Sequence, residues 1–186
     1  MIVLALARKA SAPRWWCRLV APVFVACAFG ACLLERPHPS DQELLAEFHH
    51  HRADIERVAV MAKADAQLER VSDDWFRDAD GTNYYEVGAG RLLSATRWNE
   101  YRRLFRALHL GAGISIERGD VFYERSARGI TVSGSAKGYA LLFKPPDPDA
   151  LSQSLDRIDG NRAADRDKAI WFRHIEGPWY LFFEPR

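Results

Sequence analysis

The chain has 186 residues, with 26 Lys and Arg against 25 Asp and Glu, so its formal net charge is +1. A nearly neutral chain lacks the excess of basic residues by which nucleic-acid-binding proteins attract phosphates. All three cysteines lie in the first 32 residues, which excludes a disulfide-stapled domain, a thiolate zinc site and a cysteine nucleophile beyond that point.

The N-terminal segment has the layout of an export signal. An apolar run from Leu19 to Leu34 follows a stretch with four Lys or Arg residues, and small residues precede two cysteines. The run is shorter than the roughly 20 residues that a membrane-spanning helix needs. The sequence therefore predicts that residues 1–32 are a signal peptide or a membrane anchor and that the remainder is exported.

Two cysteines are candidates for lipidation. Cys27 ends Phe24-Val25-Ala26-Cys27 and Cys32 ends Phe29-Gly30-Ala31-Cys32. Both stretches resemble the lipobox of bacterial lipoproteins, although each has Phe where that family prefers Leu. The resemblance implies that the thiol receives a diacylglyceryl group before cleavage. We favour Cys32, because cleavage at Cys27 would leave an exposed apolar tail.

Ordinary cleavage near Ala26–Ala28 and an uncleaved anchor are the alternatives to lipidation. Each of the three outcomes places the following domain outside the cytoplasm, in the periplasm. Through its N-terminal segment the chain resembles small bacterial envelope lipoproteins. Without residues 1–32 the balance is 22 basic against 25 acidic residues, a net charge of −3. Residues 33–40, with two prolines, predict a short tether before a single domain at 41–186.

The domain begins with a predicted helix. Ser40-Asp41-Gln42-Glu43 fits a capping box, and apolar residues then recur at three- and four-residue spacing as far as about Ala64. Three histidines, His49, His50 and His51, lie within this helix. Adjacent side chains fan about 100° apart on a helix, so we expect no metal site there.

Residues 65–96 are less regular. The stretch Asp78-Ala79-Asp80-Gly81 invites comparison with a calcium-binding loop, but Phe76 and Val87 occupy the positions that require carboxylates, which favours an ordinary turn. Tyr84–Val87 is a plausible short strand. A second helix is predicted from Thr96 to Leu110, with Gly111 as its C-terminal cap.

From Ile114 onward the apolar pattern has a period of two. It predicts strands at Ile114–Arg118, Val121–Arg125 and Ile130–Phe143, with turns at Gly119–Asp120 and Arg128–Gly129. In the third strand the bulky residues change parity after Gly138. We therefore expect a β-bulge at this glycine.

The C-terminal part predicts a short helix and a hairpin. Asp147-Pro148 is a favourable N-cap pair for the helix. The hairpin strands are Lys168–Ile175 and Trp179–Glu184. We expect a four-residue loop with His174 opposite Trp179, on the argument that Pro178 cannot donate the closing hydrogen bond of a shorter loop.

Candidate catalytic groups are few. Ser135 and Lys137 are predicted on one face of a strand, as a serine nucleophile and its base would be, but the helical Ser-x-x-Lys turn is missing. His174 could meet Ser135 across the sheet as a general base. No nucleophile elbow, His-Glu-x-x-His motif or phosphate loop occurs, so we predict no catalytic, metal or cofactor residues.

Taken together, the pattern predicts an α+β domain with an antiparallel sheet of five or six strands and helices packed on one face. The function we expect is that of a membrane-tethered, non-catalytic accessory or binding module of the cell envelope. Its partners would be the membrane, through the anchor, and an envelope protein. The alternative is a small envelope hydrolase with a site near Ser135 and His174.

Overall fold

The computed structural model describes residues 37–85, 92–130, 133–158 and 170–185. Contacts divide the chain into two units, Met1–Pro37 and His38–Arg186, and the fold is that of the second unit. The predicted signal or anchor segment 1–32, with Cys32 and its alternative Cys27, lies outside the described residues, as does the start of the tether.

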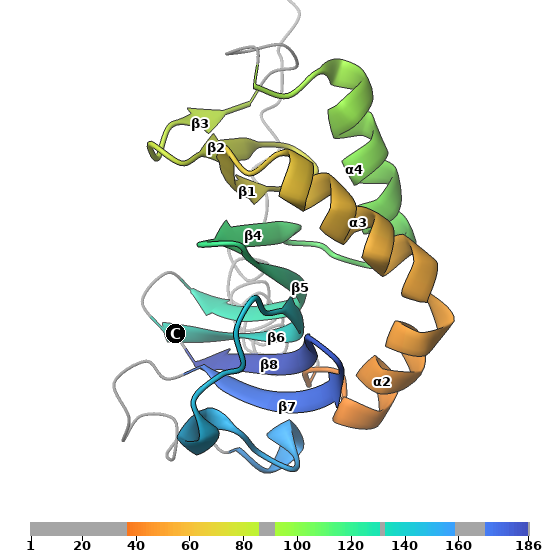
Figure 1. Ribbon diagram of the computed structural model, residues 1–186, viewed down its shortest axis with the longest axis vertical. Coiled ribbons are helices and arrows are strands. Elements are labelled where there is room, and N and C mark those ends of the chain that lie inside the picture. Colours follow the sequence, from red (N-terminus) through yellow and green to blue (C-terminus); the bar gives the residue numbers. More distant parts are fainter. Residues whose placement is uncertain (1–36, 86–91, 131–132, 159–169, 186) are drawn as a thin grey trace, which may run out of the picture. The chain divides into compact units, whose positions relative to one another are not determined.

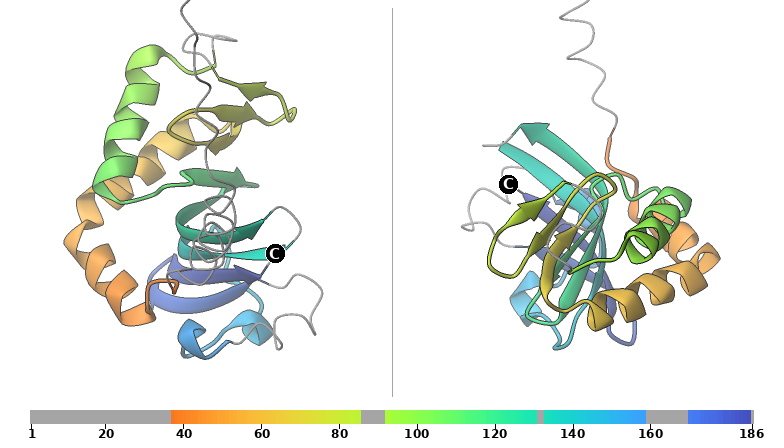
Figure 2. Two further views of the ribbon diagram at one scale, coloured as in Figure 1. Left: turned by 180° about the vertical axis from the view of Figure 1, so that it is seen from behind. Right: turned by 90° about the horizontal axis from the view of Figure 1, so that it is seen from above.

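Within the described residues, three α-helices and one open antiparallel sheet confirm the predicted α+β class (Figure 1). The helices are α2 (Asp41–His50), α3 (Arg52–Ala64) and α4 (Ala95–Ala107). The strands are β1 (Leu68–Val71), β2 (Phe76–Asp78), β3 (Asn83–Tyr84), β4 (Ile114–Glu117), β5 (Asp120–Ile130), β6 (Ser133–Leu141), β7 (Trp171–Glu176) and β8 (Trp179–Pro185). Their order is β3-β2-β1-β4-β5-β6-β8-β7, and Figure 2 shows the helices gathered on one face.

The sheet has eight strands where five or six were predicted. The additional strands β1 and β2 are only four and three residues long, and they lie in the region whose sequence shows no clear period. The prediction also placed a turn at Arg128–Gly129, but β5 continues through it to Ile130. Short strands are stabilised by pairing with distant neighbours, which a local pattern does not reveal.

The predicted first helix is divided by His51, whose φ of −104° and ψ of 20° end α2 before α3 begins. The capping box is confirmed. Ser40 Oγ accepts the backbone N–H of Glu43 over 3.2 Å, and Glu43 Oε2 accepts the backbone N–H of Ser40 over 2.7 Å. Two otherwise unpaired backbone groups are thereby satisfied where the chain enters the domain.

Helix α4 begins as expected but ends early. Ser94 Oγ caps it by accepting the backbone N–H of Arg97. The left-handed residue that follows the helix is His109, at φ 53°, and not the predicted Gly111. Leu108 and Leu110 on either side are 4% and 3% exposed, so their burial offsets the cost of a positive φ at His109.

The predicted bulge at Gly138 is found in the neighbouring strand. β5 carries an extra residue, Arg125, opposite Gly138, whereas β6 remains in continuous register with β8. Lys137 and Tyr139 therefore point to the same, helix-covered face. Gly138 is required for a different reason, because a Cβ there would lie 1.9 Å from the carbonyl oxygen of Tyr123.

The predicted register of the C-terminal hairpin is wrong. Its turn consists of Gly177 and Pro178 only, and His174 pairs with Tyr180 in place of Trp179. A β-turn is closed by the N–H of its fourth residue, here Trp179, so Pro178 at the third position needs no donor. The positive φ of Gly177, 50°, suits the first central position of such a turn.

The single helix expected after Asp147 is replaced by two 3₁₀ turns, η2 (Pro148–Ala150) and η3 (Leu155–Arg157). Asp147 does cap the first of them, as predicted. Between the turns, the backbone N–H of Ser152 donates to the carbonyl of Phe172 over 2.8 Å. This segment therefore covers the outer edge of β7, which would otherwise be open to pairing with another chain.

Apolar side chains form a core on each face of the sheet. The larger core lies under the helices and contains the fully buried Trp98, Tyr101, Tyr123 and Tyr139. The smaller core, on the opposite face, is built around Phe122, Phe172, Tyr180 and Phe182. The hairpin is thus packed on both sides, because its residues contribute to both cores.

Candidate functional site

A groove with a volume of about 1290 Å³ lies between the C-terminal half of α3, strand β1 and the turn that joins β4 to β5. It arises because β1 pairs with β4 only through Arg70↔Ser115 and Val71↔Ile114. Glu69 is an extra residue in the pairing of β1 with β2. A bulge of this kind bends its strand, so β1 turns away from β4 and the sheet opens there.

The walls of the groove are mostly apolar. They include Ala59, Ala62, Ala66, Leu68, Ile116 and Val121. Among the described residues four large apolar side chains are exposed, and two of them, Val60 at 62% and Phe143 at 79%, line this groove. Phe143 is fixed in place by its backbone N–H, which donates to Asp120 Oδ1 over 2.6 Å. Single exposed apolar residues are common, but two that line the same hollow make the groove a candidate site.

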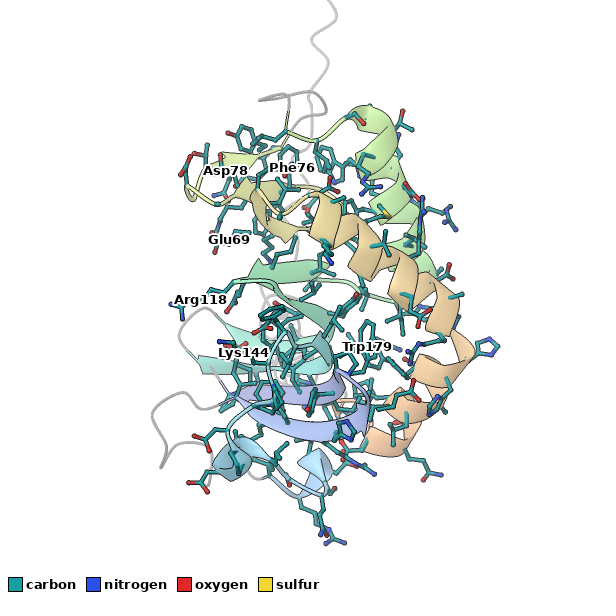
Figure 3. All side chains as sticks on the ribbon, viewed as in Figure 1. Glu69, Phe76, Asp78, Arg118, Lys144 and Trp179 are labelled. Carbon is teal, nitrogen blue, oxygen red and sulfur yellow. The ribbon has the colours of Figure 1, made fainter. Side chains whose placement is uncertain are left out.

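The β4–β5 turn contributes a strained residue to the rim. Arg118 and Gly119 have φ values of 53° and 95°, the two positive values that a two-residue type I′ hairpin requires. Asn or Gly would adopt this conformation more readily than Arg, for which it costs roughly 1–2 kcal/mol. Figure 3 shows Arg118 and Glu69 at the same end of the strands, at the left of the view, and both residues line the groove.

A smaller polar cleft of about 160 Å³ adjoins the groove and shares Glu69, Glu117 and Phe122 with it. Four glutamates and two arginines line the cleft, which gives a net charge of −2; they are Glu69, Glu117, Glu124, Glu184, Arg70 and Arg77. Arg70 forms an ion pair with the buried Glu124 over 3.0 Å, and Arg77 forms one with Glu69 over 3.5 Å. Burial, followed by the charges of Glu184, Glu69 and Asp120, raises the pKa of Glu117.

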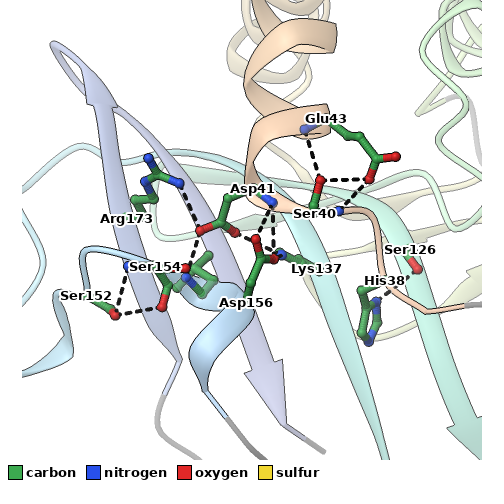
Figure 4. Close-up of polar contacts among 11 residues, drawn as sticks. His38, Ser40, Asp41, Glu43, Ser126, Lys137, Ser152, Ser154, Asp156 and Arg173 are labelled. Atoms are coloured by element: carbon green, nitrogen blue, oxygen red, sulfur yellow. Dashed lines mark hydrogen bonds and ion pairs between the residues drawn. The ribbon is translucent and has the colours of Figure 1, made fainter.

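A second polar cluster lies where the tether meets the sheet (Figure 4). His38 Nδ1 is 2.9 Å from Ser126 Oγ in β5, and His38 Nε2 is 2.7 Å from Ser135 Oγ in β6. Burial, and then the charges of Arg128 and Lys137, lower the pKa of His38 from 6.5 to about 4. The imidazole is therefore neutral at pH 7 and joins two adjacent strands.

Beside His38, a buried ion-pair network fastens the start of α2. Lys137 Nζ lies 2.9 Å from Asp41 Oδ1 and 2.5 Å from Asp156 Oδ1, and Arg173 lies 2.9 Å from Asp41 Oδ2. Lys137 and Asp41 are 3% and 2% exposed. Burial acts to raise the pKa of Asp41, but the hydrogen bonds from Lys137 and from the backbone N–H of Leu155, with the Lys137 charge, keep it below its usual value.

The structure assigns different partners to the two residues of the predicted Ser-Lys pair. Ser135 and Lys137 do share a face, yet Ser135 bonds to His38 and Lys137 bonds to two aspartates. Because Lys137 Nζ is engaged by Asp41 and Asp156, and Ser135 is bonded to His38, the two residues do not form a nucleophile–base pair. Lys137 is therefore a structural residue.

The hypothesis of a cleft between His174 and Ser135 is wrong as to geometry. Ser135 pairs with Pro185 at one end of β8, whereas His174 pairs with Tyr180 of the same strand. Pro185 and Tyr180 are five residues apart, which corresponds to about 16 Å along β8. His174 Nε2 is instead 3.0 Å from the carbonyl oxygen of Gly177, in its own hairpin turn. The two side chains also occupy opposite faces of the sheet.

His38 is a candidate catalytic residue that was not predicted from the sequence. Its 2.7 Å contact with Ser135 has the geometry of a nucleophile and its base. The electrostatics oppose that role, because a catalytic histidine is charged in the transition state and is supported by a carboxylate. Here its second nitrogen meets Ser126, and Arg128 and Lys137 disfavour the charged form.

The remaining candidates are structural. Asp78 accepts the backbone N–H groups of Asp80 and Thr82 and the hydroxyl of Tyr84, which makes the aspartate-rich loop an ordinary turn. In the described part of the chain, no three His, Cys, Asp or Glu side chains are grouped as a metal site would require.

Comparison of the chain with models of protein families, with curated proteins and with solved structures finds no match. None of the helices in the described ranges combines the length and the apolar composition that a bilayer span requires. The groove beside α3 and the polar cluster at the tether are thus the two features on which a function can be based.

Proposed function

We propose that this protein is a membrane-tethered binding module of the bacterial cell envelope, and that a partner protein occupies the groove beside α3. The tethering part of the proposal rests on the signal-like segment 1–32 and on Cys32 as the lipidated residue. The binding part rests on one observation, the large groove with Val60 and Phe143 exposed on it. Ligand sites of small molecules are commonly about 300–1000 Å³, so a larger open groove suits a protein segment better.

A binding role is favoured over catalysis by the chemistry of the polar groups. The positive charge of Lys137 is balanced by the carboxylates of Asp41 and Asp156. Burial and two nearby cations lower the pKa of His38, which disfavours its charged form. Neither group lines the groove. The groove itself offers apolar contact and charged rims, which are the components of a recognition surface.

The groove and the point where the chain enters the domain are separate features. His38 is bonded to Ser135, whereas the groove is reached at Leu141, about 20 Å farther along β6. A partner bound in the groove would therefore not need to displace His38 from the sheet.

Site-specific photocrosslinking in living cells tests the binding role. p-Benzoylphenylalanine placed at Val60 or at Phe143 should give a discrete crosslinked protein, and the same group at Leu151, an exposed apolar position outside the groove, should not. The adduct formed at Val60 should disappear when Phe143→Asp is added. Equal adducts at all three positions, or none at Val60 and Phe143, would refute the binding role.

The tether is tested independently. Intact-mass analysis of the membrane fraction should show a chain that starts at a diacylated Cys32, and Cys32→Ala should release or misprocess the protein. An unmodified N-terminus beyond Cys32, or a Cys32→Ala protein that remains membrane-bound, would contradict lipidation. Neither result would alter the expectation for the groove.

A further inference from the structure

We infer that Arg128 and Ser135 bind an oxyanion, a phosphate or carboxylate group, at the end of the sheet where His38 joins β5 and β6. The site is separate from the groove and does not depend on the binding function proposed there. It is defined by an arginine without a partner, by an unused hydroxyl hydrogen next to it, and by their access to solvent.

Arg128, in β5, is a cation without an acidic partner among the described residues. Its Nη2 atom is buried and has no hydrogen-bond acceptor. The cations Arg125, Lys137 and Arg173, in contrast, each form an ion pair with a carboxylate of α2. A guanidinium stays charged at neutral pH, and a buried charged donor without an acceptor is costly. An anion from solution would supply the acceptor that these residues do not.

The carboxylates at this end of the sheet are engaged with other groups. Asp41 and Asp156 both contact Lys137, over 2.9 Å and 2.5 Å. Glu43 accepts two hydrogen bonds from the N-cap residue of α2. In the described part of the chain none of these three carboxylates forms an ion pair with Arg128. The charge of Arg128 is therefore available to a ligand.

Arg128, Ser135 and His38 converge on one face of the sheet. Arg128 and Ser135 are directly opposite in the register of β5 and β6, so their side chains leave the same face with Cβ atoms roughly 5 Å apart. His38 lies on this face, because its Nε2 is 2.7 Å from Ser135 Oγ. Burial, followed by the charge of Arg128, lowers the pKa of His38, so the guanidinium is close to the imidazole.

A neutral imidazole leaves one serine hydroxyl hydrogen unused. It has one N–H donor and one acceptor nitrogen, so it donates to one of Ser126 and Ser135 and accepts from the other. The serine that accepts the N–H keeps its own O–H free to donate. When Nε2 carries the hydrogen, the free O–H is that of Ser135, beside Arg128. An oxyanion there would accept this O–H and a guanidinium N–H, and would favour the Nε2–H tautomer.

The site is open enough for a ligand to enter and dry enough to hold it. His38, Arg128 and Ser135 are all half-buried. The ring of Phe183 stands edge-on to His38, with 5.7 Å between centroids, and shields one side of the imidazole. Partial burial strengthens charge-assisted hydrogen bonds relative to those in water. Free phosphate and the phosphate of a lipid head group share the required chemistry, and the test separates them.

The test follows His38 by NMR in the full-length protein, labelled with ¹⁵N-histidine and held in a sugar detergent that contains no phosphate. Long-range ¹H–¹⁵N spectra at pH 7 report the tautomer of each imidazole, and His38→Gln identifies the signals of His38. Inorganic phosphate should shift these signals saturably toward the Nε2–H tautomer, and acetate should act in the same direction. Chloride at equal ionic strength should not.

Variants assign the response to its residues. Arg128→Gln should weaken phosphate binding by about tenfold or more, because the charged donor is lost. Arg103→Gln, at an exposed arginine of α4, is the matched control and should change it by less than about twofold. Ser135→Ala should weaken binding by about fivefold, the equivalent of one hydrogen bond, and Ser126→Ala by less. Since Arg128 has no partner to lose, Arg128→Gln should be as stable as the wild type in phosphate-free urea titrations.

A second arm identifies the source of the anion. Nanodiscs that contain phosphatidylglycerol should produce the Arg128-dependent change without added phosphate if a head group is the ligand, and free phosphate should be needed if it is not. Either result supports an oxyanion site.

Three outcomes would overturn the inference and leave the groove untouched. The first is that neither phosphate, acetate nor phosphatidylglycerol changes the signals of His38. The second is an equal change in Arg128→Gln. The third is a response that appears only after Glu35→Gln, since the acceptor for Arg128 would then be a carboxylate of the chain itself.

Discussion

Replacing Lys137 by Met should cost about 3 kcal/mol of unfolding free energy, although Met fits the space of a Lys side chain well. Lys137 and Asp41 are almost completely buried and form an ion pair over 2.9 Å. Removing one member of a buried pair typically costs 3–5 kcal/mol, because the other charge is left without compensation. We expect the lower limit, since Asp41 keeps its hydrogen bond from Leu155 and its ion pair with Arg173.

A double-mutant cycle separates this charge effect from simple loss of packing. Lys137→Met combined with Asp41→Asn leaves no uncompensated buried charge, so the double variant should be more stable than Lys137→Met alone by about 1–2 kcal/mol. Lys144→Met, at an exposed lysine, is the control and should stay within about 0.5 kcal/mol of the wild type.

Urea unfolding at pH 7, followed by the fluorescence of the buried Trp98 and Trp179, measures the wild type, the single variants Lys137→Met and Asp41→Asn, the double variant and the Lys144→Met control. Asp41 is ionised at this pH, because its pKa is held below the usual value. A cost below about 1 kcal/mol for Lys137→Met, or strictly additive changes in the cycle, would show that the buried network is absent and that α2 is not fastened at its first residue.

Three further predictions concern other regions. The pKa of His38 is about 4 in the folded state, below its ordinary value of 6.5, so the unfolded chain binds the proton first as the pH falls. The contribution of neutral His38 to the unfolding free energy is therefore fully present above about pH 6.5 and is lost as the pH falls toward 4. Between pH 7 and pH 5 the wild type should lose about 1–2 kcal/mol, allowing for partial exposure, and His38→Gln should lose measurably less in chemical unfolding. Arg118→Asn should raise the unfolding free energy by about 0.5–1 kcal/mol, since Asn adopts a positive φ more easily; a lower melting temperature would show that the turn is not of type I′. Phe182→Ala, at a side chain 1% exposed, should cost about 3–5 kcal/mol and clearly more than Trp171→Ala at a half-buried position; equal costs in urea titration would contradict the packing of the hairpin.

The features that were predictable from the sequence are those with local causes. The capping box at Ser40 and Glu43 depends on residues three apart, and the amphipathic pattern of the first helix depends on neighbours within one or two turns. Both are found in the structure. The cap formed by Asp147 is likewise a local contact, although the turn that it begins is shorter than the predicted helix.

The features that were not predictable have partners far away in the chain. Lys137 was predicted only to share a face of its strand with Ser135, yet Asp41 and Asp156 meet it from two other segments. The bulge was assigned to Gly138, but the extra residue is in β5, because the need for glycine arises from the close approach of Tyr123. Long-range contacts of this kind decide which face a side chain occupies.

The groove illustrates the same limit for function, because what distinguishes its residues is their exposure and not their type. Val60 has the same side chain as the buried Val58 two positions earlier on α3, and only the rotation of the helix leaves it open to solvent. Burial raises the pKa of Glu117, and the charges of Glu184, which lies 67 residues later in the sequence, and of Glu69, next to the bulge in β1, raise it further. A valine and a glutamate in isolation indicate no site. The fold brings Val60 and Glu117, together with Lys63 and Arg118, to the walls of one groove, and a local sequence pattern does not reveal that juxtaposition.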